Sequence, residues 1–484
     1  MKIWRLGFLN AFVLLVIAFA LYACNRTTPN NQASVVNQIF EKGNIQLDVD
    51  EITLGVIPEG TNTDLRVSSD QGAKHVAWVA QKNSKWACIL DGKEIAIFDK
   101  IERPVFSPDG NHLAYTATRN GKQFIVLDGK EGHEYDEIGF YIHIFSTDSK
   151  HIAYGAKKGD KSFMVIDGRE GEGFDKVGGL FFSPDSRRTA YAAMRNGKWF
   201  MVIDGKIQEH ELREYGARFS PDSKHIVIKA KRNDKEYFVI DSLAGTEYDD
   251  VGYITFSPDS KHWFFRAKSG RKNYLVVDGI EKQDFGMIEG AEFSPDRKQL
   301  AYIVQDSKQT KVILDGKTIG SSYDEVRFLI FSPDSRRIAF WARRNKKQFM
   351  VIDGKEGKHY PPPSRTSSHR GPLWLRFSPD SKRIVYTLAT EKGAISFVDE
   401  AIAPWDSVVA FFTPDSRHVV TVKRNIYPDN TTIALTVDGI PISSNYSLFK
   451  DVAPFFDAPD RFHFIAIRNG KVIRINVRII ENKK

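Results

Sequence analysis

The chain has 484 residues, of which 42% are hydrophobic and 27% are charged, so it is long and apolar enough to bury a large core. Only two cysteines are present, which excludes a disulfide-stabilised scaffold. The formal net charge is +8. No recognition helix, aromatic RNA-binding motif or zinc-finger pattern accompanies that charge, so we expect no nucleic-acid partner.

Residues 1–23 are expected to form a signal peptide. Lys2 and Arg5 make its start positive, and residues 6–20 are almost wholly apolar. Leu21-Tyr22-Ala23-Cys24 then resembles a bacterial lipobox, which implies lipidation of Cys24 and a membrane contact through the lipid anchor. We therefore expect an exported protein of the bacterial cell envelope, facing the periplasm or held at the outer membrane. An uncleaved anchor and ordinary cleavage after Ala23 stay open, and both also export the chain.

Residues 24–43 have the composition of a flexible tether. They contain Pro29 and several asparagines, and no hydrophobic period starts before Val35. Ile45–Ile52 then alternates like the outer strand of a sheet, although it stands ahead of the first repeat. We expect residues 44–52 to pair with the last repeat, which lacks an outer strand of its own. Residues 44–484 would then form one repeat domain.

A four-residue phrase recurs through the rest of the chain. Phe106-Ser107-Pro108-Asp109 returns at Phe182, Phe219, Phe256, Phe293, Phe331 and Phe377, with weaker copies at Phe145 and Phe412. Degenerate copies stand at residues 67–70 and 456–460. A period of about 38 residues over most of a chain indicates a repeat architecture.

Each repeat reads as four short strands. In the second copy these are residues 103–106, 112–117, 123–127 and 134–138. Asn120-Gly121 and Asp128-Gly129 separate the later strands, and such pairs favour tight hairpins because both residues accept positive φ. Four antiparallel strands repeated about eleven times predict an all-β propeller. One large ring and two tandem rings both remain open.

The repeated Phe-Ser-Pro-Asp-(Gly/Ser)-(Lys/Arg)-x-(Leu/Ile)-Ala-Tyr is similar to the TolB-type propeller repeat, a relative of WD-repeat blades. The resemblance covers roughly residues 64 to 478. It implies a periplasmic or envelope-associated binding protein. The same repeat occurs in prolyl-oligopeptidase-like enzymes, but those carry an α/β-hydrolase domain for which this chain has no room.

The recurrent acidic and histidine positions are expected to be structural. An aspartate that recurs in every blade is expected to have a local structural role, such as accepting hydrogen bonds from backbone N–H groups of the turn. Histidines recur at the start of the second strand, too far apart around a ring to share a metal, and pairing with the motif aspartate three residues earlier is one explanation. The turn aspartates are Asp109, Asp185, Asp222, Asp259, Asp296, Asp334 and Asp380.

No catalytic or cofactor motif stands out. The sequence has no Gly-x-Ser-x-Gly elbow, no His-Glu-x-x-His pair, no phosphate-binding glycine loop and no EF-hand spacing. Cys88 stands in an apolar strand and is expected to be a buried small hydrophobe. We therefore expect no enzyme activity, no metal and no cofactor.

Basic residues gather in the loop between the second and third strands, so one face of a propeller would be positive and could attract an acidic partner. The alternative is that exposed hairpins use cations for solubility, with nearby carboxylates neutralising them. Two irregular loops, residues 360–372 and 427–430, are further contact candidates. The candidate binding residues are Arg119, Lys122, Arg195, Lys198, Arg343, Arg344, Arg365, His369 and Arg370.

These observations predict a lipid-anchored propeller of the cell envelope that binds an envelope protein or peptide as a non-enzymatic scaffold. The alternative is an envelope hydrolase or lyase whose active site lies in the propeller channel. An enzyme should bring carboxylates or histidines from outside the repeat together in one pocket, whereas a scaffold should have a channel lined mainly by repeat residues.

Overall fold

The computed structural model describes residues 36–42, 45–57, 68–70, 72, 74–139, 144–282, 286–306, 309–362, 372–390, 393–399, 401–403, 409–424, 432–448 and 454–481. Residues 35–484 form one compact unit. Every regular element in the described ranges is a β-strand, and none of these residues belongs to a helix long and apolar enough to cross a membrane.

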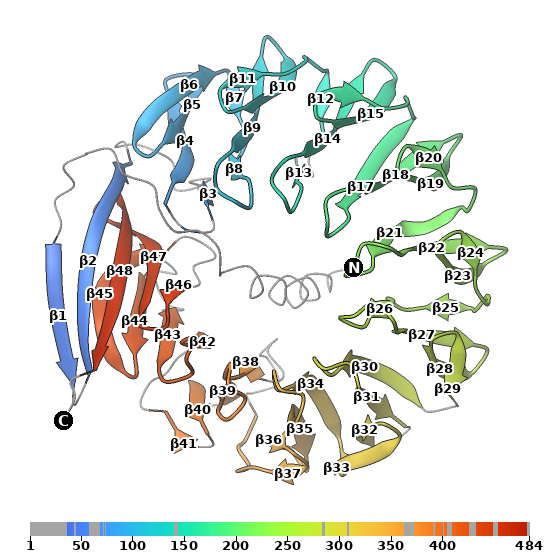
Figure 1. Cartoon of the computed structure of the whole chain (residues 1–484), viewed down its shortest axis with the longest axis vertical. Helices are drawn as coiled ribbons and strands as arrows, with labels where there is room; N and C mark the ends of the chain where they lie inside the picture. The colour runs from blue at the N-terminus through green and yellow to red at the C-terminus, as the bar shows by residue number, and fades with distance from the viewer. Residues whose placement is uncertain are drawn as a thin grey trace. The chain divides into compact units, whose positions relative to one another are not determined.

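The strands form eleven antiparallel blades, which we number in chain order (Figure 1). Blade 1 contains β3 (Ser68–Ser69), β4 (Val76–Lys82), β5 (Lys85–Leu90) and β6 (Lys93–Phe98), and blade 2 contains β7 (Lys100–Ile101), β8 (Val105–Phe106), β9 (Leu113–Arg119), β10 (Lys122–Leu127) and β11 (Lys130–Glu131). Blade 3 contains β12 (Glu137–Ile138), β13 (Ile144–Phe145), β14 (Ile152–Lys158), β15 (Lys161–Ile166) and β16 (Arg169–Glu170), and blade 4 contains β17 (Lys176–Phe182), β18 (Thr189–Arg195), β19 (Lys198–Ile203) and β20 (Lys206–Ile207). Blade 5 contains β21 (Leu212–Phe219), β22 (Ile226–Arg232), β23 (Lys235–Ile240) and β24 (Leu243–Ala244).

Blades 6 to 11 follow the same plan. Blade 6 contains β25 (Asp250–Val251), β26 (Thr255–Phe256), β27 (Trp263–Ser269), β28 (Lys272–Val277) and β29 (Ile280–Lys282), and blade 7 contains β30 (Met287–Phe293), β31 (Leu300–Gln305), β32 (Thr310–Leu314) and β33 (Lys317–Tyr323). Blade 8 contains β34 (Glu325–Phe331), β35 (Ile338–Arg344), β36 (Lys347–Ile352) and β37 (Lys355–Glu356), and blade 9 contains β38 (Pro372–Phe377), β39 (Ile384–Thr390), β40 (Gly393–Val398) and β41 (Ala401–Ile402). Blade 10 contains β42 (Val409–Phe412), β43 (Val419–Arg424), β44 (Thr432–Val437) and β45 (Ile440–Leu448), and blade 11 contains β46 (Phe455–Ala458), β47 (Arg461–Arg468) and β48 (Lys471–Glu481), with β2 (Ile45–Val56) and β1 (Val36–Lys42).

The hairpin turns follow from the sequence. Asn120 and Gly121 have φ of 51° and 77°, and Asp128 and Gly129 have φ of 50° and 78°, as the two-residue hairpin requires. One boundary differs from the sequence prediction. The outer strand of blade 2 is β11, whereas Glu137–Ile138 is β12 and pairs with β14 in blade 3. Tyr135 still reaches back to blade 2 through a single bridge with Gln123, so the chain leaves one blade gradually.

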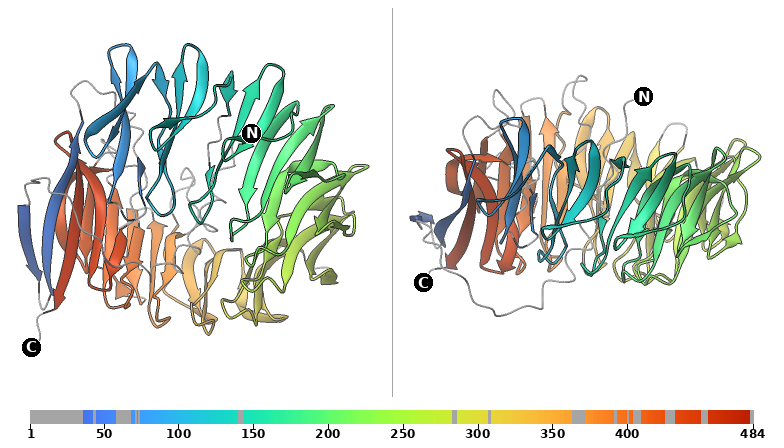
Figure 2. Two further views of the ribbon diagram at one scale, coloured as in Figure 1. Left: turned by 45° about the horizontal axis from the view of Figure 1, so that its top comes forward. Right: turned by 90° about the horizontal axis from the view of Figure 1, so that it is seen from above.

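Hydrophobic clusters lie between neighbouring blades all round the ring. Each successive pair of blades contributes buried residues to a shared cluster, including the pair formed by blade 11 and blade 1. In ring order, representative members are Val79 with Tyr115, Ile125 with Tyr154, Met164 with Tyr191, Met201 with Ile228, Phe238 with Phe265, Leu275 with Tyr302, Ile303 with Phe340, Trp341 with Tyr386, Val385 with Phe412, Leu435 with Phe464 and Ile465 with Trp78. The blades therefore form one closed ring, and the two-ring alternative is wrong (Figure 2).

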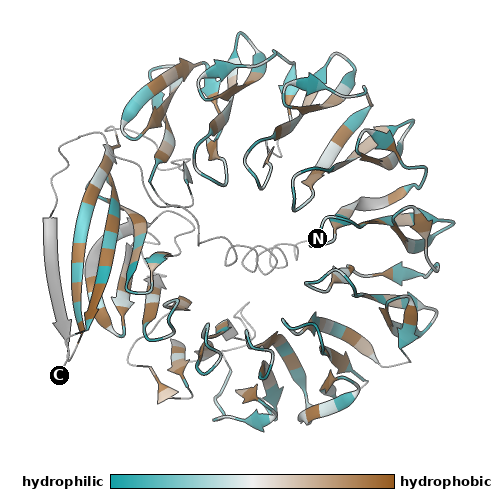
Figure 3. Cartoon of the chain, viewed as in Figure 1, coloured by the Kyte–Doolittle hydropathy of each residue, from teal (hydrophilic) through white to brown (hydrophobic). Residues whose placement is uncertain are grey.

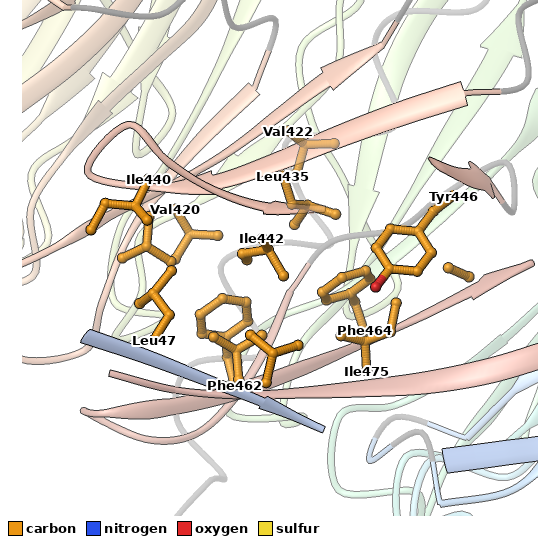
Figure 4. Close-up of a cluster of buried hydrophobic side chains, with 14 of the residues drawn as sticks. Leu47, Val420, Val422, Leu435, Ile440, Ile442, Tyr446, Phe462, Phe464 and Ile475 are labelled. Carbon is orange, nitrogen blue, oxygen red and sulfur yellow. The ribbon is translucent and has the colours of Figure 1, made fainter. Parts of the chain in front are cut away.

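The first strands of the chain complete the last blade. β2 pairs antiparallel with β48 from Ile45 opposite Glu481 to Val56 opposite Lys471. Hydrophobic and hydrophilic residues alternate along both strands (Figure 3), and the inward-facing Leu47 joins the buried cluster shown in Figure 4. This is the pairing expected for Ile45–Ile52, and it joins the two ends of the repeat domain.

A buried ion pair and a glycine fix β2 at this seam. Glu51 is 4% exposed, pairs with the Arg468 guanidinium, and accepts a 2.6 Å hydrogen bond from the Tyr446 hydroxyl. Gly55 lies against blade 1, where an added Cβ would meet the Trp78 ring and come within 2.9 Å of Gly92 Cα. The seam thus needs a glycine for close approach, besides the backbone pairing of the strands.

The tether is shorter than the sequence analysis predicts. Val36–Lys42, placed there in the tether, forms β1 and pairs with β2 from Val36 opposite Glu51 to Lys42 opposite Ile45. The sequence does not predict this strand, because a short and mostly polar segment resembles a linker. The strand forms because β2 lies beside it and offers backbone groups for pairing. Blades 10 and 11 also share one nine-stranded sheet, because β45 pairs with β47.

Candidate functional site

The motif aspartates close the turn between the first and second strands. In blade 4, Ser183 Oγ donates to Asp185 Oδ1 at 2.6 Å, and the same oxygen accepts the Arg187 N–H at 3.1 Å. These hydrogen bonds hold the pKa of the Asp185 carboxyl below its usual value. The other six turn aspartates make the same pair of bonds, namely Asp109, Asp222, Asp259, Asp296, Asp334 and Asp380.

The same turns are linked from blade to blade. The Asp185 N–H donates to Ser223 Oγ of blade 5 at 2.9 Å, and Ser223 holds the left-handed conformation with φ of 66°. Equivalent bonds join Asp109 to Ser149, Asp148 to Ser186, Asp222 to Ser260, Asp296 to Ser335, Asp334 to Ser381 and Asp380 to Ser416. One face of the ring is therefore tied together by the motif.

The recurrent histidines clamp a second turn. His112 Nδ1 lies 2.7 Å from Asp128 Oδ2, while Asp128 Oδ1 accepts the Leu113 N–H at 2.9 Å. The suggestion that these histidines pair with the motif aspartate three residues earlier is therefore wrong, because the partner lies 16 residues later. The same clamp occurs at His75, His151, His225, His262 and His418, and arginine replaces histidine at Arg188, Arg337 and Arg383.

The clamp also reaches the next blade. The His112 ring stacks on the Phe145 ring with 6.5 Å between the ring centres, and the Arg337 guanidinium lies 5.2 Å from the Phe377 ring centre. Within the described ranges, no group of three or more His, Cys, Asp or Glu side chains could hold a metal ion. Cys88 is fully buried, and burial raises the pKa of its thiol to about 12.

The described basic candidates are each paired with carboxylates. The pairs are Arg119 with Glu131 and Glu134, Lys122 with Asp136, Arg195 with Glu172, Lys198 with Glu211, Arg343 with Glu325 and Arg344 with Glu356, at 2.5 to 3.7 Å. Asp136 also accepts the Gly159 N–H of blade 3 at 2.7 Å, so it joins two blades. This face has mixed charge instead of a ring of free cations.

Several sequence-derived candidates lie outside the described residues. These are the lipidation site Cys24, the loop residues Arg365, His369 and Arg370, and the loop at 427–430.

A recess lies where blades 6, 7 and 8 approach the central opening. Its volume is about 540 Å³, within the range of small-ligand sites. It is bordered by the inner strands β30 and β34, which Figure 1 shows on the inside of the ring. Its lining residues are Arg266, Met287, Glu289, Gly290, Ala291, Glu292, Ile303, Val326, Arg327, Phe328 and Leu329.

Two β-bulges aim side chains into this recess. In β30 the register skips Glu289, and in β34 it shifts between Arg327 and Ile330, leaving Phe328 and Leu329 opposite one residue. Phe328 has φ of 56°, which costs a non-glycine residue roughly 1–2 kcal/mol. The residue is 46% exposed. An exposed aromatic side chain held in a strained conformation is a candidate contact residue.

The charges of the recess are unevenly satisfied. Arg266 donates to the Ile288 carbonyl at 2.6 Å, and Arg327 Nε lies 2.7 Å from Glu325. Glu292 is partly exposed, yet burial raises the pKa of its carboxyl to about 7. No described residue forms an ion pair with Glu289 or Glu292. The recess therefore combines an apolar wall with two carboxyl groups that form no ion pair with a described residue.

Sequence reasoning missed this site, because the position of Phe328 varies from repeat to repeat. Three residues before the motif phenylalanine stand Gly179, Gly216 and Gly290 in blades 4, 5 and 7. Gly179 has φ of 58°, almost the value of Phe328 in blade 8. Other blades have Arg103, Tyr253, Trp374 and Val409 at this position, so the sequence alone does not single out Phe328, and only the backbone conformation that it shares with Gly179 does.

Comparisons with known proteins give only distant likenesses. No family model matches the sequence, and no curated protein is significantly similar to it. Similar solved structures include a eukaryotic initiation factor (TM-score 0.36, 14% identity, covering 67% of this chain and 96% of that chain), TolB from Acinetobacter baumannii (TM-score 0.24, 15% identity, 59% and 78%) and the β-propeller domain of the Trilobed protease from Pyrococcus furiosus (TM-score 0.25, 16% identity, 60% and 96%). Likenesses this distant concern the fold and carry no argument about function.

Proposed function

We propose that this protein is a lipid-anchored propeller of the cell envelope that binds another envelope protein or a peptide without catalysing a reaction. The observation that carries the proposal is that the recurrent polar side chains have structural roles. The motif aspartates, the histidine or arginine clamps and the hairpin cations each hold a turn or join neighbouring blades. Such a ring is a rigid scaffold on which the residues that depart from the repeat are left to make contacts.

The anchor and the compartment rest on the sequence. The lipobox-like Leu21-Tyr22-Ala23-Cys24 supports lipidation at Cys24, and the apolar stretch before it supports export. The mixed-charge hairpin face can still receive an acidic partner, provided that the partner competes for cations such as Arg119 and Lys122, which already have carboxylate neighbours.

Cross-linking and capture test the proposal. The full-length protein carrying a C-terminal affinity tag would be cross-linked in envelope membranes and purified, and co-purifying proteins identified. The proposal expects a small, reproducible set of envelope proteins that is missing from a control purification of an unrelated tagged lipoprotein. A purification that yields only the tagged chain, with or without cross-linker, would contradict it.

The second candidate is a hydrolase or lyase acting in the channel. The observation that favours it is the pair Glu289 and Glu292 in one recess, with the pKa of Glu292 raised to about 7, because a general acid works best near the ambient pH. Glu292→Gln would separate the two candidates. An enzyme should lose nearly all turnover of envelope glycans or peptides, whereas wild-type protein without measurable turnover excludes this candidate for the substrates used.

A further inference from the structure

We propose that the recess between β30 and β34 binds an extended peptide in which a lysine or arginine stands beside a large apolar side chain. This inference rests on the proposed function, since it names the class of partner segment and the place where it binds.

The apolar half of the recess can receive one large side chain. Ile303, Val326 and Leu329 form its wall, and Met287 and Phe328 are exposed at its edge. Exposed apolar side chains next to a hollow of about 540 Å³ leave an apolar surface that a partner can cover. A phenylalanine or leucine of the partner would gain burial there without requiring the blades to move.

The polar half selects positive charge. Arg327 pairs with Glu325, whereas Arg266 donates to the neutral Ile288 carbonyl, which positions its guanidinium without balancing its charge. Glu289 and Glu292 have no ion-pair partner among the described residues, so two carboxyl groups stand against the single guanidinium of Arg266 and leave the recess with an excess of negative charge. A carboxylate in a recess gains most from a cationic partner that replaces the lost water.

The strand edge suits a peptide backbone. Among the described strands β30 pairs only with β31, so no described strand pairs with its other edge, although the Ile288 carbonyl already accepts a hydrogen bond from Arg266. An extended segment can add main-chain hydrogen bonds to such an edge while its side chains enter neighbouring hollows. The bulge at Glu289 places a carboxylate in the same stretch of β30.

Phe328→Gly separates binding from folding. Gly179 occupies the equivalent position of blade 4 with φ of 58°, so glycine fits the backbone of β34 without rearrangement. The variant removes the aromatic ring and relieves the left-handed strain, so its melting temperature should not fall. Leu243→Ala is the matched control, since Leu243 is 77% exposed on an outer strand and does not line the recess.

The probes are fluorescein-labelled hexapeptides with the sequences Gly-Ser-Phe-Lys-Ser-Gly, Gly-Ser-Phe-Glu-Ser-Gly and Gly-Ser-Ser-Lys-Ser-Gly, titrated by fluorescence anisotropy with the full-length protein in detergent. The Phe-Lys peptide should bind at least roughly tenfold more tightly than either of the others. Phe328→Gly should weaken it about fivefold or more, and Glu292→Gln should remove the preference for lysine over glutamate. Leu243→Ala should bind like the wild type.

The pH dependence gives a further readout. Deprotonation of Glu292, whose pKa is about 7, should strengthen binding of the Phe-Lys peptide from about pH 6 to about pH 8. The other charged groups of the recess are Arg266, Glu289 and Arg327. Glu292→Gln should flatten this profile.

Absence of Phe-Lys binding, equal affinities for the three peptides, or unchanged affinity in both recess variants would overturn the inference. Capture from cross-linked envelopes keeps the two proposals distinguishable. If wild type, Phe328→Gly and Glu292→Gln retain the same envelope proteins, the scaffold function stands and the recess is not its site. If wild type retains none, the scaffold function itself is wrong.

Discussion

Replacing the buried carboxylate at the ring seam should destabilise the whole propeller. Glu51 on β2 pairs with Arg468 on β47, and the two residues belong to opposite ends of the chain. Glu51→Gln keeps the shape of the side chain and leaves an oxygen for the Tyr446 hydroxyl, but removes the charge that balances the guanidinium. The variant therefore tests the ion pair apart from the packing of β2.

The expected magnitude follows from burial. Removing one partner of a fully buried ion pair costs roughly 3–5 kcal/mol. The Glu51 side chain is 5% exposed but that of Arg468 is 30% exposed, so the arginine can recover part of its hydration. We therefore expect a loss of about 2–3 kcal/mol in the free energy of unfolding.

Urea unfolding followed by tryptophan fluorescence measures this loss, and Glu131→Gln is the matched control. Glu131 makes the same two-point contact with Arg119, at 3.0 and 2.8 Å, but on the surface of a single blade. Exposed pairs contribute little, so the control midpoint should stay near that of the wild type. Equal midpoints for Glu51→Gln and Glu131→Gln would refute the reasoning.

Three further predictions concern the seam and the anchor. Deleting residues 36–56 behind an intact signal sequence should give insoluble or strongly destabilised protein, because it exposes the packing partners of the buried Leu47 and Val49, each of which contributes about 1.5–3 kcal/mol to stability. Deleting residues 26–34 is the control and should not change the thermal midpoint. Equal midpoints for the two deletions would contradict the seam. Cys24→Ser should abolish metabolic labelling with palmitate, and an unlabelled wild type would exclude the lipid anchor. Burial alone would lower the pKa of His418, but its hydrogen bond to Asp438 and the charges of Asp438 and Glu481 outweigh burial and raise that pKa. The stability that His418 contributes should therefore be full below about pH 6.5 and fall as pH rises through the raised pKa. The difference in unfolding free energy between wild type and His418→Gln should shrink toward alkaline pH, and a constant difference would contradict this prediction.

Local turn chemistry made much of the fold readable from the sequence. Asn120-Gly121 and Asp128-Gly129 dictate hairpins because their backbone conformations are rare for other residues, and the spacing of the motif phenylalanines counts the blades. Ile45–Ile52 could be read as a strand because its apolar residues alternate. The single ring could not be read, since the choice depends on which distant blades share a hydrophobic cluster.

The partners of polar residues were less readable. The clamp that joins His112 to Asp128 forms across a hairpin register, so sequence proximity suggested the wrong aspartate. The recess needs Arg266, Glu292 and Phe328 from three blades, and no one repeat contains its pattern. The left-handed Phe328 is set by a bulge that glycine occupies comfortably in blade 4, so only comparison between blades exposes it.

Cross-linking of β2 to β48 tests the single closed ring most directly. Asp48 lies opposite Arg478, so cysteines at these two positions should form a disulfide on oxidation in a chain that also carries Cys24→Ser and Cys88→Ala. The oxidised chain would become a covalent circle and migrate differently on a non-reducing denaturing gel, and reductant should reverse the change. A control pair at Asp48 and Lys282, on the outer strand of blade 6, should not cross-link. Absence of the shift for the Asp48 and Arg478 pair, with both thiols still open to alkylation in the folded protein, would contradict a propeller closed by its N-terminal strand.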